Sequence, residues 1–511
     1  MCPEKLVFEI NSSRTERVNE VVLLIANADK DCSRSKKKLA PIFGSQSYQV
    51  PGTGIEPAHP CERQILSLLR LPIPPSGLKF GLQYYRLMSD RQNAWLFILE
   101  GVIWRRSRQV MLKIGLIREG KIPADNRVAL TPQQCKWVQE KFNVTVIVQQ
   151  SETRCFRDSE YLAAGIRLQE DVSDCDILFG IKEVPVAMLI PGKTYLFFSH
   201  TKKLQPYNQK LLRAIMDKEI TLIDYECLEH DDGTRIIGFG FFAGVVGAHN
   251  GMMAYGKRTG AFNLGRVYRQ KNFQQLIHTY FGLKLPLVKI AVTGSGRVAH
   301  GILEIMNLME IHEAEPDEYL EGDFEYPVYV HLKGADLYRD RTTGKYLRST
   351  FHEHPEHYDC LFHRYLKQTD ILLNGVYWED RIPRLFETAD LQSPDFRINT
   401  IADISDDRNG SVPCNIMDGT MENPVYGVDR RTLALTPPYL PGSVDVMAVG
   451  NLPNELPRDA SRYFGEQLIK FVLGDLVAGT ARDIDKATIV RKGKLTPAFE
   501  YMSAYAEQRS S

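Results

Sequence analysis

The segment LPLVKIAVTGSGRVAHGILEIMNLMEIHEAE constrains the fold of this chain more than any other, because it joins a strand to a helix through a glycine turn. Residues 287–292 form an apolar, β-branched run, Gly294 and Gly296 make the turn, and residues 298–309 have helical spacing. Backbone N–H groups at the start of such a helix, together with the helix dipole, bind phosphate. The segment therefore predicts a Rossmann unit that holds a dinucleotide.

Five residues of this unit are predicted to contact the dinucleotide. Gly294 permits the turn, and Gly296 lets the backbone approach the phosphates. Arg297 and Val298 open the helix and are assigned to the same site. Glu315 lies 21 positions after Gly294, close to the spacing of about 20 for a carboxylate that accepts from a ribose hydroxyl. We therefore expect NAD as the cofactor, with NADP as the alternative.

Length and composition set the class of protein. The chain has 511 residues, 43% hydrophobic and 25% charged, which is enough for two domains with their own cores. Its 63 basic and 63 acidic residues cancel, so no net field favours a nucleic acid or a membrane surface. A small-molecule partner is expected, bound by a monomer or a small homo-oligomer.

The cysteines and histidines give no metal or disulfide pattern. Nine cysteines are scattered without a CxxC pair, which predicts a reducing, cytoplasmic location. His352, His354, His357 and His363 lie in a polar segment, and we expect no metal there. No run of 18 apolar residues occurs, and the nearest candidate, residues 94–104, carries a glutamate. No membrane span is predicted.

Short apolar runs alternate with helical segments from Met111 onward, which predicts an α/β fold. The expected strands of a first sheet are residues 113–119, 144–150, 176–182, 193–200 and 220–226. The expected strands of a second sheet are residues 288–294, 370–378 and 399–405. Residues 316–363 are interpreted as an insertion, and the loop and helix at 451–473 are expected to pack back on the first sheet.

These patterns predict two Rossmann-like parallel-sheet domains, with the cofactor domain inserted in the substrate domain. Residues 1–110 sustain no long period and are expected to be a poorly ordered N-terminal extension. They lack the basic start and apolar core of a secretory signal. The remaining expected boundaries are 111–240 for the substrate domain, 241–411 for the NAD(P)-binding domain, 412–476 for the second part of the substrate domain, and 477–511 for a flexible tail.

Seven motifs occur together and in order: REGKIPADNRVALTP, FGIKEVP, FFSHTKK, LIDYECLEHDDGTRIIGFGFFAG, TGSGRVAHG, IADIS and NLPNELPRDAS. Over residues 111–476 the chain resembles the lysine-forming saccharopine dehydrogenases, whose two-domain architecture is shared with alanine dehydrogenase and proton-translocating transhydrogenases. It also resembles the lysine–ketoglutarate reductase half of the bifunctional lysine-degrading enzyme. The resemblance implies reversible conversion of saccharopine, NAD(P)+ and water to L-lysine, 2-oxoglutarate and NAD(P)H.

Lys182 and His200 are the predicted catalytic residues. Each follows an expected strand, so both emerge at the carboxyl edge of the sheet, where open α/β sheets bind their ligands. Hydride leaves a carbon only after the adjacent nitrogen has lost its proton, and water must then attack the imine. Two proton carriers are therefore needed, and a crowded lysine and an imidazole both titrate near neutral pH. The resemblance implies the same pair.

Saccharopine carries three carboxylates, an ammonium and a secondary amine, so its site needs several cations and some anions. Arg127, Lys203 and Arg235 are the predicted carboxylate binders. Glu183 and Glu226 are the predicted partners of the ammonium.

Two further residues complete the predicted site. Phe239 is expected at the cleft wall near the hinge between the domains, and Asp403 is expected to face the nicotinamide or the cleft. Asp407 occupies the position that resembles the alanine dehydrogenase aspartate, although its surroundings, DDRNGS, differ. An alanine dehydrogenase and a catalytically silent NAD-binding sensor remain as alternatives, and the physiological direction of the reaction stays open.

Overall fold

The computed structural model describes residues 111–479 and 482–507, together with five short strands nearer the N-terminus. Those strands are β1 (Val21–Leu23), β2 (Leu69–Leu71), β3 (Leu82–Gln83), β4 (Phe97–Leu99) and β5 (Val102–Trp104). β1 pairs with β2, and β4 pairs with β3 and β5, all antiparallel. The chain divides into Met1–Gln109 and Val110–Ser511, and the second unit is described below. Apart from these strands, the prediction for residues 1–110 lies outside the described residues.

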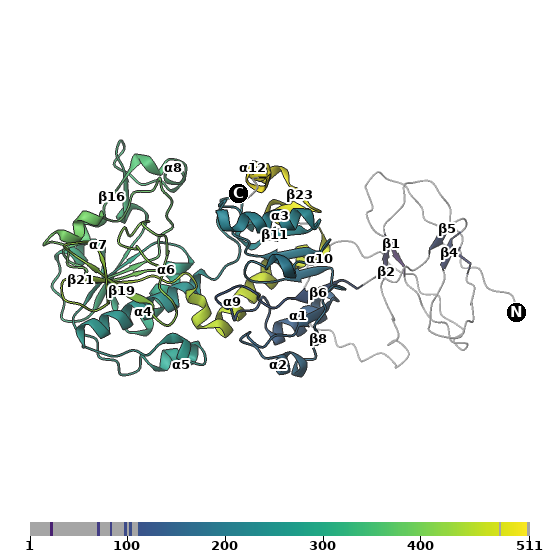
Figure 1. The fold of residues 1–511 in the computed structure, drawn as a ribbon, viewed down its shortest axis with the longest axis horizontal. Coiled ribbons are helices and arrows are strands. Elements are labelled where there is room, and N and C mark those ends of the chain that lie inside the picture. The colour runs from purple at the N-terminus through teal and green to yellow at the C-terminus, as the bar shows by residue number, and fades with distance from the viewer. Residues whose placement is uncertain are drawn as a thin grey trace, which may run out of the picture. The chain divides into compact units, whose positions relative to one another are not determined.

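An eight-stranded first sheet has the order β23-β22-β11-β10-β9-β6-β7-β8 (Figure 1). Its strands are β6 (Lys113–Leu116), β7 (Thr145–Gln149), β8 (Arg167–Gln169), β9 (Ile177–Phe179), β10 (Thr194–Phe197), β11 (Thr221–Asp224), β22 (Thr488–Arg491) and β23 (Lys494–Leu495). The strands from β6 to β11 are parallel, whereas β22 and β23 run antiparallel to their neighbours. The five strands predicted for this sheet are confirmed.

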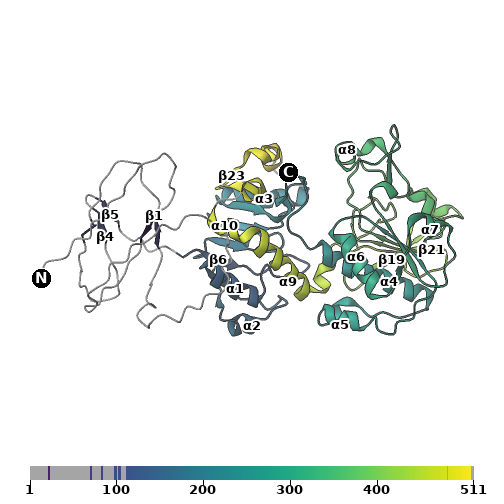
Figure 2. The same ribbon diagram turned by 180° about the vertical axis from the view of Figure 1, so that it is seen from behind.

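The helices that accompany the first sheet come from both ends of the described chain. They are α1 (Pro132–Phe142), α2 (Asp158–Ala163), α3 (Gln209–Asp217), α9 (Pro457–Leu468), α10 (Gly474–Ala478), α11 (Arg482–Ala487) and α12 (Ser503–Glu507). α1 begins in a capping box between Thr131 and Gln134, with Pro132 at its first position. The Gln134 amide also donates to the carbonyl of Arg462 in α9 at 2.8 Å, so α9 packs on α1 as expected (Figure 2).

A second sheet, also of eight strands, has the order β13-β14-β12-β17-β18-β21-β19-β20 and is parallel from β13 to β21. Its strands are β12 (Lys289–Thr293), β13 (His312–Glu313), β14 (Val328–Leu332), β17 (Ile371–Asn374), β18 (Thr400–Asp403), β19 (Val425–Asp429), β20 (Leu435–Thr436) and β21 (Ser443–Met447). Its helices are α4 (Gly240–Thr259), α5 (Phe273–His278), α6 (Arg297–Leu308), α7 (Pro316–Glu321) and α8 (Arg348–Glu353), and a hairpin of β15 (Tyr338–Asp340) and β16 (Tyr358–Cys360) is added. In the chain, the residues of the second sheet lie between the two segments that form the first sheet. The predicted fold class is confirmed.

Helices α4 and α6 cross at two glycines. A Cβ on Gly244 would lie 2.0 Å from the Val298 carbonyl oxygen, and a Cβ on Gly301 would lie 2.0 Å from the Phe241 carbonyl oxygen. The backbones therefore approach more closely than any side chain allows. This contact fixes α6, which follows the glycine turn, against α4, through which the chain leaves the first sheet.

Three predicted boundaries were wrong. Residues 412–447 do not belong to the substrate domain, because β19, β20 and β21 all join the second sheet, and the chain returns to the first sheet only with α9. Residues 316–363 are not only an insertion, since β14 pairs directly with β12. Residues 477–511 are not a flexible tail throughout, because β22 pairs with β11 and buries Ile489 and Val490. Strand partners so far apart in sequence leave no local signal.

No helix in the described part of the chain is long and apolar enough to cross a membrane.

Candidate active site

The loops that follow β9, β10 and β11 meet at one edge of the first sheet, because these strands are parallel. The buried carboxylate of Asp224 ties two of them together. Its Oδ2 accepts from the Ser199 backbone N–H at 3.0 Å and from the Ser199 hydroxyl, and its Oδ1 accepts from the Glu226 backbone N–H at 2.7 Å. Lys182 and His200 thus come to one edge, as predicted, and Glu226 joins them there.

Glu183 lies between a lysine and the predicted catalytic histidine. Its Oε1 is 2.7 Å from His200 Nδ1, and its Oε2 accepts from Lys121 Nζ at 2.7 Å. Burial opposes ionisation of Glu183, but the hydrogen bond and charge of His200 and the bond from Lys121 outweigh it, and the pKa falls to about 2. An ionised carboxylate accepts from Nδ1–H, so Nε2 is the nitrogen left to exchange a proton with a substrate or water.

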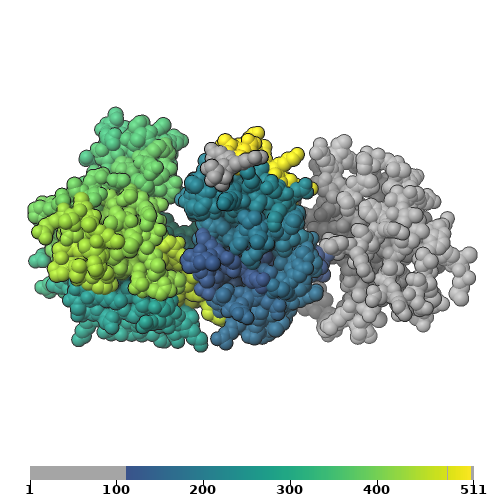
Figure 3. Space-filling model, in the orientation of Figure 1, coloured from purple at the N-terminus to yellow at the C-terminus, as the bar shows by residue number. Residues whose placement is uncertain are grey.

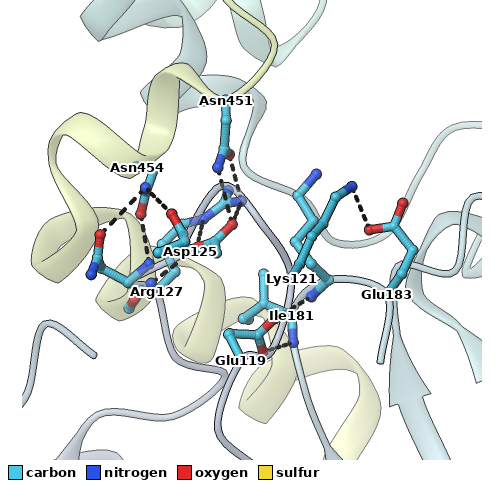
Figure 4. A network of polar contacts seen from close by, with 12 residues as sticks. Glu119, Lys121, Asp125, Arg127, Ile181, Glu183, Asn451 and Asn454 are labelled. Atoms are coloured by element: carbon cyan, nitrogen blue, oxygen red, sulfur yellow. Dashed lines mark hydrogen bonds and ion pairs between the residues drawn. The ribbon is translucent and has the colours of Figure 1, made fainter. Parts of the chain in front are cut away.

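The backbone at Lys182 is fixed by a carboxyl group from the loop after β6. Glu119 Oε2 accepts from the Lys182 N–H at 2.9 Å, and Oε1 accepts from the Ile181 N–H at 2.6 Å (Figure 4). Burial and the nearby charge of Arg127 lower the pKa of Lys182 to about 8. Burial also raises the pKa of Glu119 to about 8. Lys182 therefore gives up its proton at a lower pH than an exposed lysine does.

Arg127 is only 3% exposed and is paired within its own loop. Its Nε donates to Asp125 Oδ1 at 3.0 Å, its Nη2 donates to Asp125 Oδ2 at 2.6 Å, and Nη2 also donates to Asn451 Oδ1 at 2.7 Å (Figure 4). Burial alone would raise the pKa of Asp125, but the Arg127 charge and hydrogen bonds hold it well below its usual range. The guanidinium also lies 4.1 Å from the ring centroid of Phe239.

Arg235 and Lys203 are the more accessible predicted carboxylate binders. Arg235 Nη2 lies 2.5 Å from Glu226 Oε1, and the Arg235 side chain is 47% exposed. The Arg235 carbonyl accepts from Arg297 Nη2, which links this loop to the start of α6. Lys203 is exposed, and its charge opposes the burial that raises the pKa of Asp407 to about 6. Both cations therefore lie near groups of the second sheet.

The glycine turn fits a dinucleotide. Gly294 has φ +108°, and a Cβ there would lie 2.4 Å from the Gly375 carbonyl oxygen, so only glycine is accommodated. Gly296 caps α6, and a Cβ there would meet no heavy atom within 4 Å. The space in front of the α6 N-terminus is thus open to a phosphate. Val298, by contrast, packs its side chain beside Gly375.

Glu315 is not at the end of the strand next to β12. It caps α7 after the edge strand β13, and β14 lies between β13 and β12. Neighbouring strands are about 4.8 Å apart, so the expected ribose position falls at the end of β14 instead. The exposed residue that follows β14 is Lys333. The prediction for Glu315 relied on distance along the chain, which gives no strand order.

Asp403 does not face a cleft, which corrects a second prediction. It is fully buried and accepts from Asn374 Nδ2 at 2.8 Å, Ser405 Oγ at 2.7 Å and Asn415 Nδ2 at 2.8 Å. Burial raises its pKa, although these bonds oppose the rise. Its position at the end of β18 was predicted, but its bonds to Asn374 and Asn415 were not, because these two residues come from other segments.

Phe239 packs at the start of α4, and its predicted place at a cleft wall stays a prediction. Its ring stacks on Phe464 of α9 at a centroid distance of 4.5 Å and an angle of 8°. It is 9% exposed, beneath the guanidinium of Arg127. It therefore joins the start of α4 to the first sheet and supports Arg127 from below.

Four residues of the site were not singled out from the sequence: Glu119, Lys121, Asp125 and Asn451. All four belong to the quoted motifs REGKIPADNRVALTP and NLPNELPRDAS. Their place in these quoted motifs was the signal that the sequence offered. Their pairing was hidden, since Asn451 and Asp125 are 326 residues apart.

Among the described residues, one His/Glu group has ligand atoms within 4.8 Å of one another: His354, Glu356 and His357, all exposed. His354 Nδ1 lies 3.2 Å from Glu356 Oε1, and Arg381 Nη1 lies 3.8 Å from Glu356 Oε2. The nearby arginine disfavours a cation. The expectation that no metal is bound stays a prediction.

Comparison with known proteins confirms the resemblance inferred from the motifs. Residues 115–246 match the family described as alanine dehydrogenase/PNT, N-terminal domain. The chain is 30% identical over 448 residues to alpha-aminoadipic semialdehyde synthase, mitochondrial, of Mus musculus, a match that covers 78% of this chain and 48% of that protein. This chain thus spans about half the length of that relative.

A second relative is matched over nearly its whole length. Saccharopine dehydrogenase (NAD(+), L-lysine-forming) of Emericella nidulans is 27% identical over 386 residues, which cover 71% of this chain and 91% of that protein. Among solved structures, an L-alanine dehydrogenase is similar with a TM-score of 0.53 and 17% identity, covering 77% of this chain and 99% of that chain. This last likeness supports the two-domain fold.

Proposed function

We propose that this chain, which carries an alanine dehydrogenase/PNT N-terminal domain and is similar to lysine-forming saccharopine dehydrogenases, is itself a nicotinamide-dependent saccharopine dehydrogenase. One observation carries the proposal. A lysine with a pKa lowered to about 8 and a histidine bound to an ionised glutamate lie at the same edge of a parallel sheet. These are the two proton carriers that oxidation of a secondary amine followed by imine hydrolysis requires.

The reaction balances as saccharopine, NAD(P)+ and water giving L-lysine, 2-oxoglutarate, NAD(P)H and a proton. When bound, the dinucleotide accepts the hydride. Neutral Lys182 takes a proton from the protonated secondary amine, and the nitrogen lone pair that this frees forms the C=N bond as the C–H electron pair leaves as hydride. His200 Nε2 takes a proton from the water that attacks the imine carbon, while Glu183 holds Nδ1–H and stabilises the imidazolium.

The charged residues around this pair suit a substrate with three carboxylates. Arg235 and Lys203 are exposed cations, and Arg127 adds a buried one whose charge is compensated by Asp125. Glu226 has one oxygen on Arg235, while its other oxygen, buried, has no hydrogen-bond partner in the described part of the chain. We propose that this oxygen accepts from a substrate ammonium, because an unpaired buried carboxylate oxygen is costly.

We propose that NADP is accepted in addition to NAD. Lys333 follows β14, the strand next to the glycine turn, and a lysine there attracts a ribose 2′-phosphate, whereas a carboxylate repels it. The name of the fungal relative specifies NAD(+) for that protein. Assays with both cofactors are therefore part of the test.

The test is a matrix of steady-state assays with purified full-length protein. Lysine with 2-oxoglutarate and ammonia with pyruvate are each supplied with NADH and with NADPH. Consumption of the reduced cofactor only with lysine and 2-oxoglutarate supports the proposal. Turnover of ammonia and pyruvate would instead establish the alanine dehydrogenase alternative, and cofactor binding without turnover would establish the silent sensor.

We also propose a cytoplasmic monomer or small homo-oligomer. Scattered cysteines support a reducing compartment. Because the name of the mouse relative assigns that protein to mitochondria, cell fractionation is the measurement that decides.

A further inference from the structure

The end of the described chain packs on the loop that carries His200. We call residues 497–507 the tail segment, made of the 3₁₀ helix η12 (Pro497–Met502) and α12, and residues 199–208 the histidine loop. The Tyr501 hydroxyl donates to the Lys202 carbonyl at 3.2 Å, and the Tyr505 hydroxyl donates to the Gln205 carbonyl at 2.5 Å. Both bonds reach backbone atoms, so they constrain the path of the histidine loop.

The tail segment is itself fixed to the first sheet. Phe499 and Met502 are buried, and the segment follows the β22–β23 hairpin that extends the sheet beyond β11. The start of α3 adds two contacts, because Gln209 Nε2 donates to the Tyr505 carbonyl at 2.7 Å and Arg213 Nε donates to the Ala506 carbonyl at 2.9 Å. In Figure 3 this part of the chain, in yellow, lies directly on the teal residues of the first sheet.

The histidine loop needs such support. His200 has φ +51° and Leu204 has φ +55°, left-handed conformations that residues with a Cβ adopt at a cost and keep only when neighbours hold them. On the inner side, Asp224 holds Ser199, and Asn208 Nδ2 donates to the His200 carbonyl at 3.2 Å. These inner bonds constrain the two ends of the loop.

The middle of the loop is held from the other side. Lys202 and Gln205, whose carbonyls receive the tyrosine hydroxyls, lie on either side of Leu204. We propose that Tyr501 and Tyr505 are positioning residues that keep the histidine loop in the conformation in which His200 meets Glu183. The effect on catalysis rests on the proposed function, but the effect on the loop does not.

The kinetic test uses Tyr501→Phe, Tyr505→Phe and the double variant in the full-length chain. Loss of each hydrogen bond should lower kcat about fivefold, while KM for the dinucleotide stays unchanged because the glycine turn lies on the other sheet. Tyr161→Phe is the matched control. Its hydroxyl also donates to a backbone carbonyl, that of Leu130 at 2.9 Å, but away from the histidine loop.

A second measurement separates this inference from the proposed function. The histidine loop contains Lys202 and Lys203, two trypsin sites, so a looser loop should be cleaved faster. We expect cleavage after these lysines to accelerate about tenfold in the double variant, with faster hydrogen exchange of the loop amides, and to stay unchanged in Tyr161→Phe. This result supports the inference even if the native protein turns over no saccharopine.

The opposite result overturns it. If the double variant and Tyr161→Phe are cleaved at the same rate after Lys202 and Lys203, the tail segment does not hold the loop. Should the double variant fail to fold, the comparison is made with Tyr501→Phe, whose side chain is half exposed and tolerates the change.

Discussion

At the scale of single residues, the proposed chemistry depends on two side chains in different electrostatic surroundings. Lys182→Met and His200→Gln should each retain dinucleotide affinity, because neither residue belongs to the glycine turn. Each should lower kcat by about 10² to 10⁴, the usual contribution of a positioned acid or base. Steady-state kinetics in both directions and a fluorescence titration of NADH measure the two effects. Near-native kcat in both variants would contradict the assignment of the site.

The pKa of Lys182 also predicts a pH profile. Only the neutral amine accepts a proton, and burial and Arg127 lower its pKa to about 8. The rate of saccharopine oxidation should therefore rise with pH up to about 8 and then level off. The residual rate of Lys182→Met should not rise with pH in this range. If it does rise, the pH dependence belongs to another titrating group.

We expect the choice between NAD and NADP to depend on Lys333, whose position beside the glycine turn follows from the strand order. Lys333→Asp should shift the ratio of kcat/KM from NADP toward NAD, because a carboxylate repels the 2′-phosphate and accepts from the free ribose hydroxyl. Glu315→Ser is the matched control, since Glu315 follows the edge strand β13. It should leave the ratio unchanged. A shift in Glu315→Ser without one in Lys333→Asp would restore the original prediction.

At the scale of secondary-structure elements, two glycines of α6 have opposite roles. Gly301→Ala should lower the free energy of unfolding by about 3 kcal/mol, because the new Cβ meets backbone of α4 that cannot move aside. Gly296→Ala should leave stability unchanged, since its Cβ enters open space, but should raise KM for the dinucleotide. Thermal unfolding and steady-state kinetics of both variants check this, and equal melting temperatures would show that the helices separate freely.

Several strands that are covered on both faces of the sheet were predicted from the sequence. β6, β7 and β9 are such strands, and they read as continuous apolar runs. β14 was missed because its run, VYVHL, contains a histidine and lies in a polar, histidine-rich segment. The position of β14 beside β12 could not be derived at all, since pairing in a parallel sheet is not set by neighbours in the chain.

The same distinction holds for the site. The place of Lys182 and His200 at one edge of the sheet was predictable, because residues that follow parallel strands gather there. The bonds of Asp125 to Asn451 and of Asp403 to Asn374 and Asn415 were not, because each joins segments that the sequence separates. Residue type and local position are readable from the sequence, whereas burial and pairing depend on the assembled fold.

At the scale of the whole molecule, the two ends of the chain should respond differently to truncation. Deletion of residues 1–110 should leave kcat and the melting temperature unchanged, because residue contacts separate Met1–Gln109 from the rest. Removal of residues 482–511 should abolish soluble expression, because it strips β22 and β23 from the first sheet and exposes the edge of β11. Soluble yield and circular dichroism measure both. A soluble, fully active C-terminal truncation would contradict the second expectation.

The pairing of β11 with β22 also has a consequence for how the protein is made. The second sheet is continuous from β12 to β21, so a ribosome can release it as a unit that folds while synthesis continues. The first sheet begins to emerge earlier but stays incomplete, with β11 unpaired on one side until residues 488–491 are translated. The domain made first is thus finished last, and a nascent chain stalled before residue 488 presents a bare strand edge to chaperones and to other nascent chains.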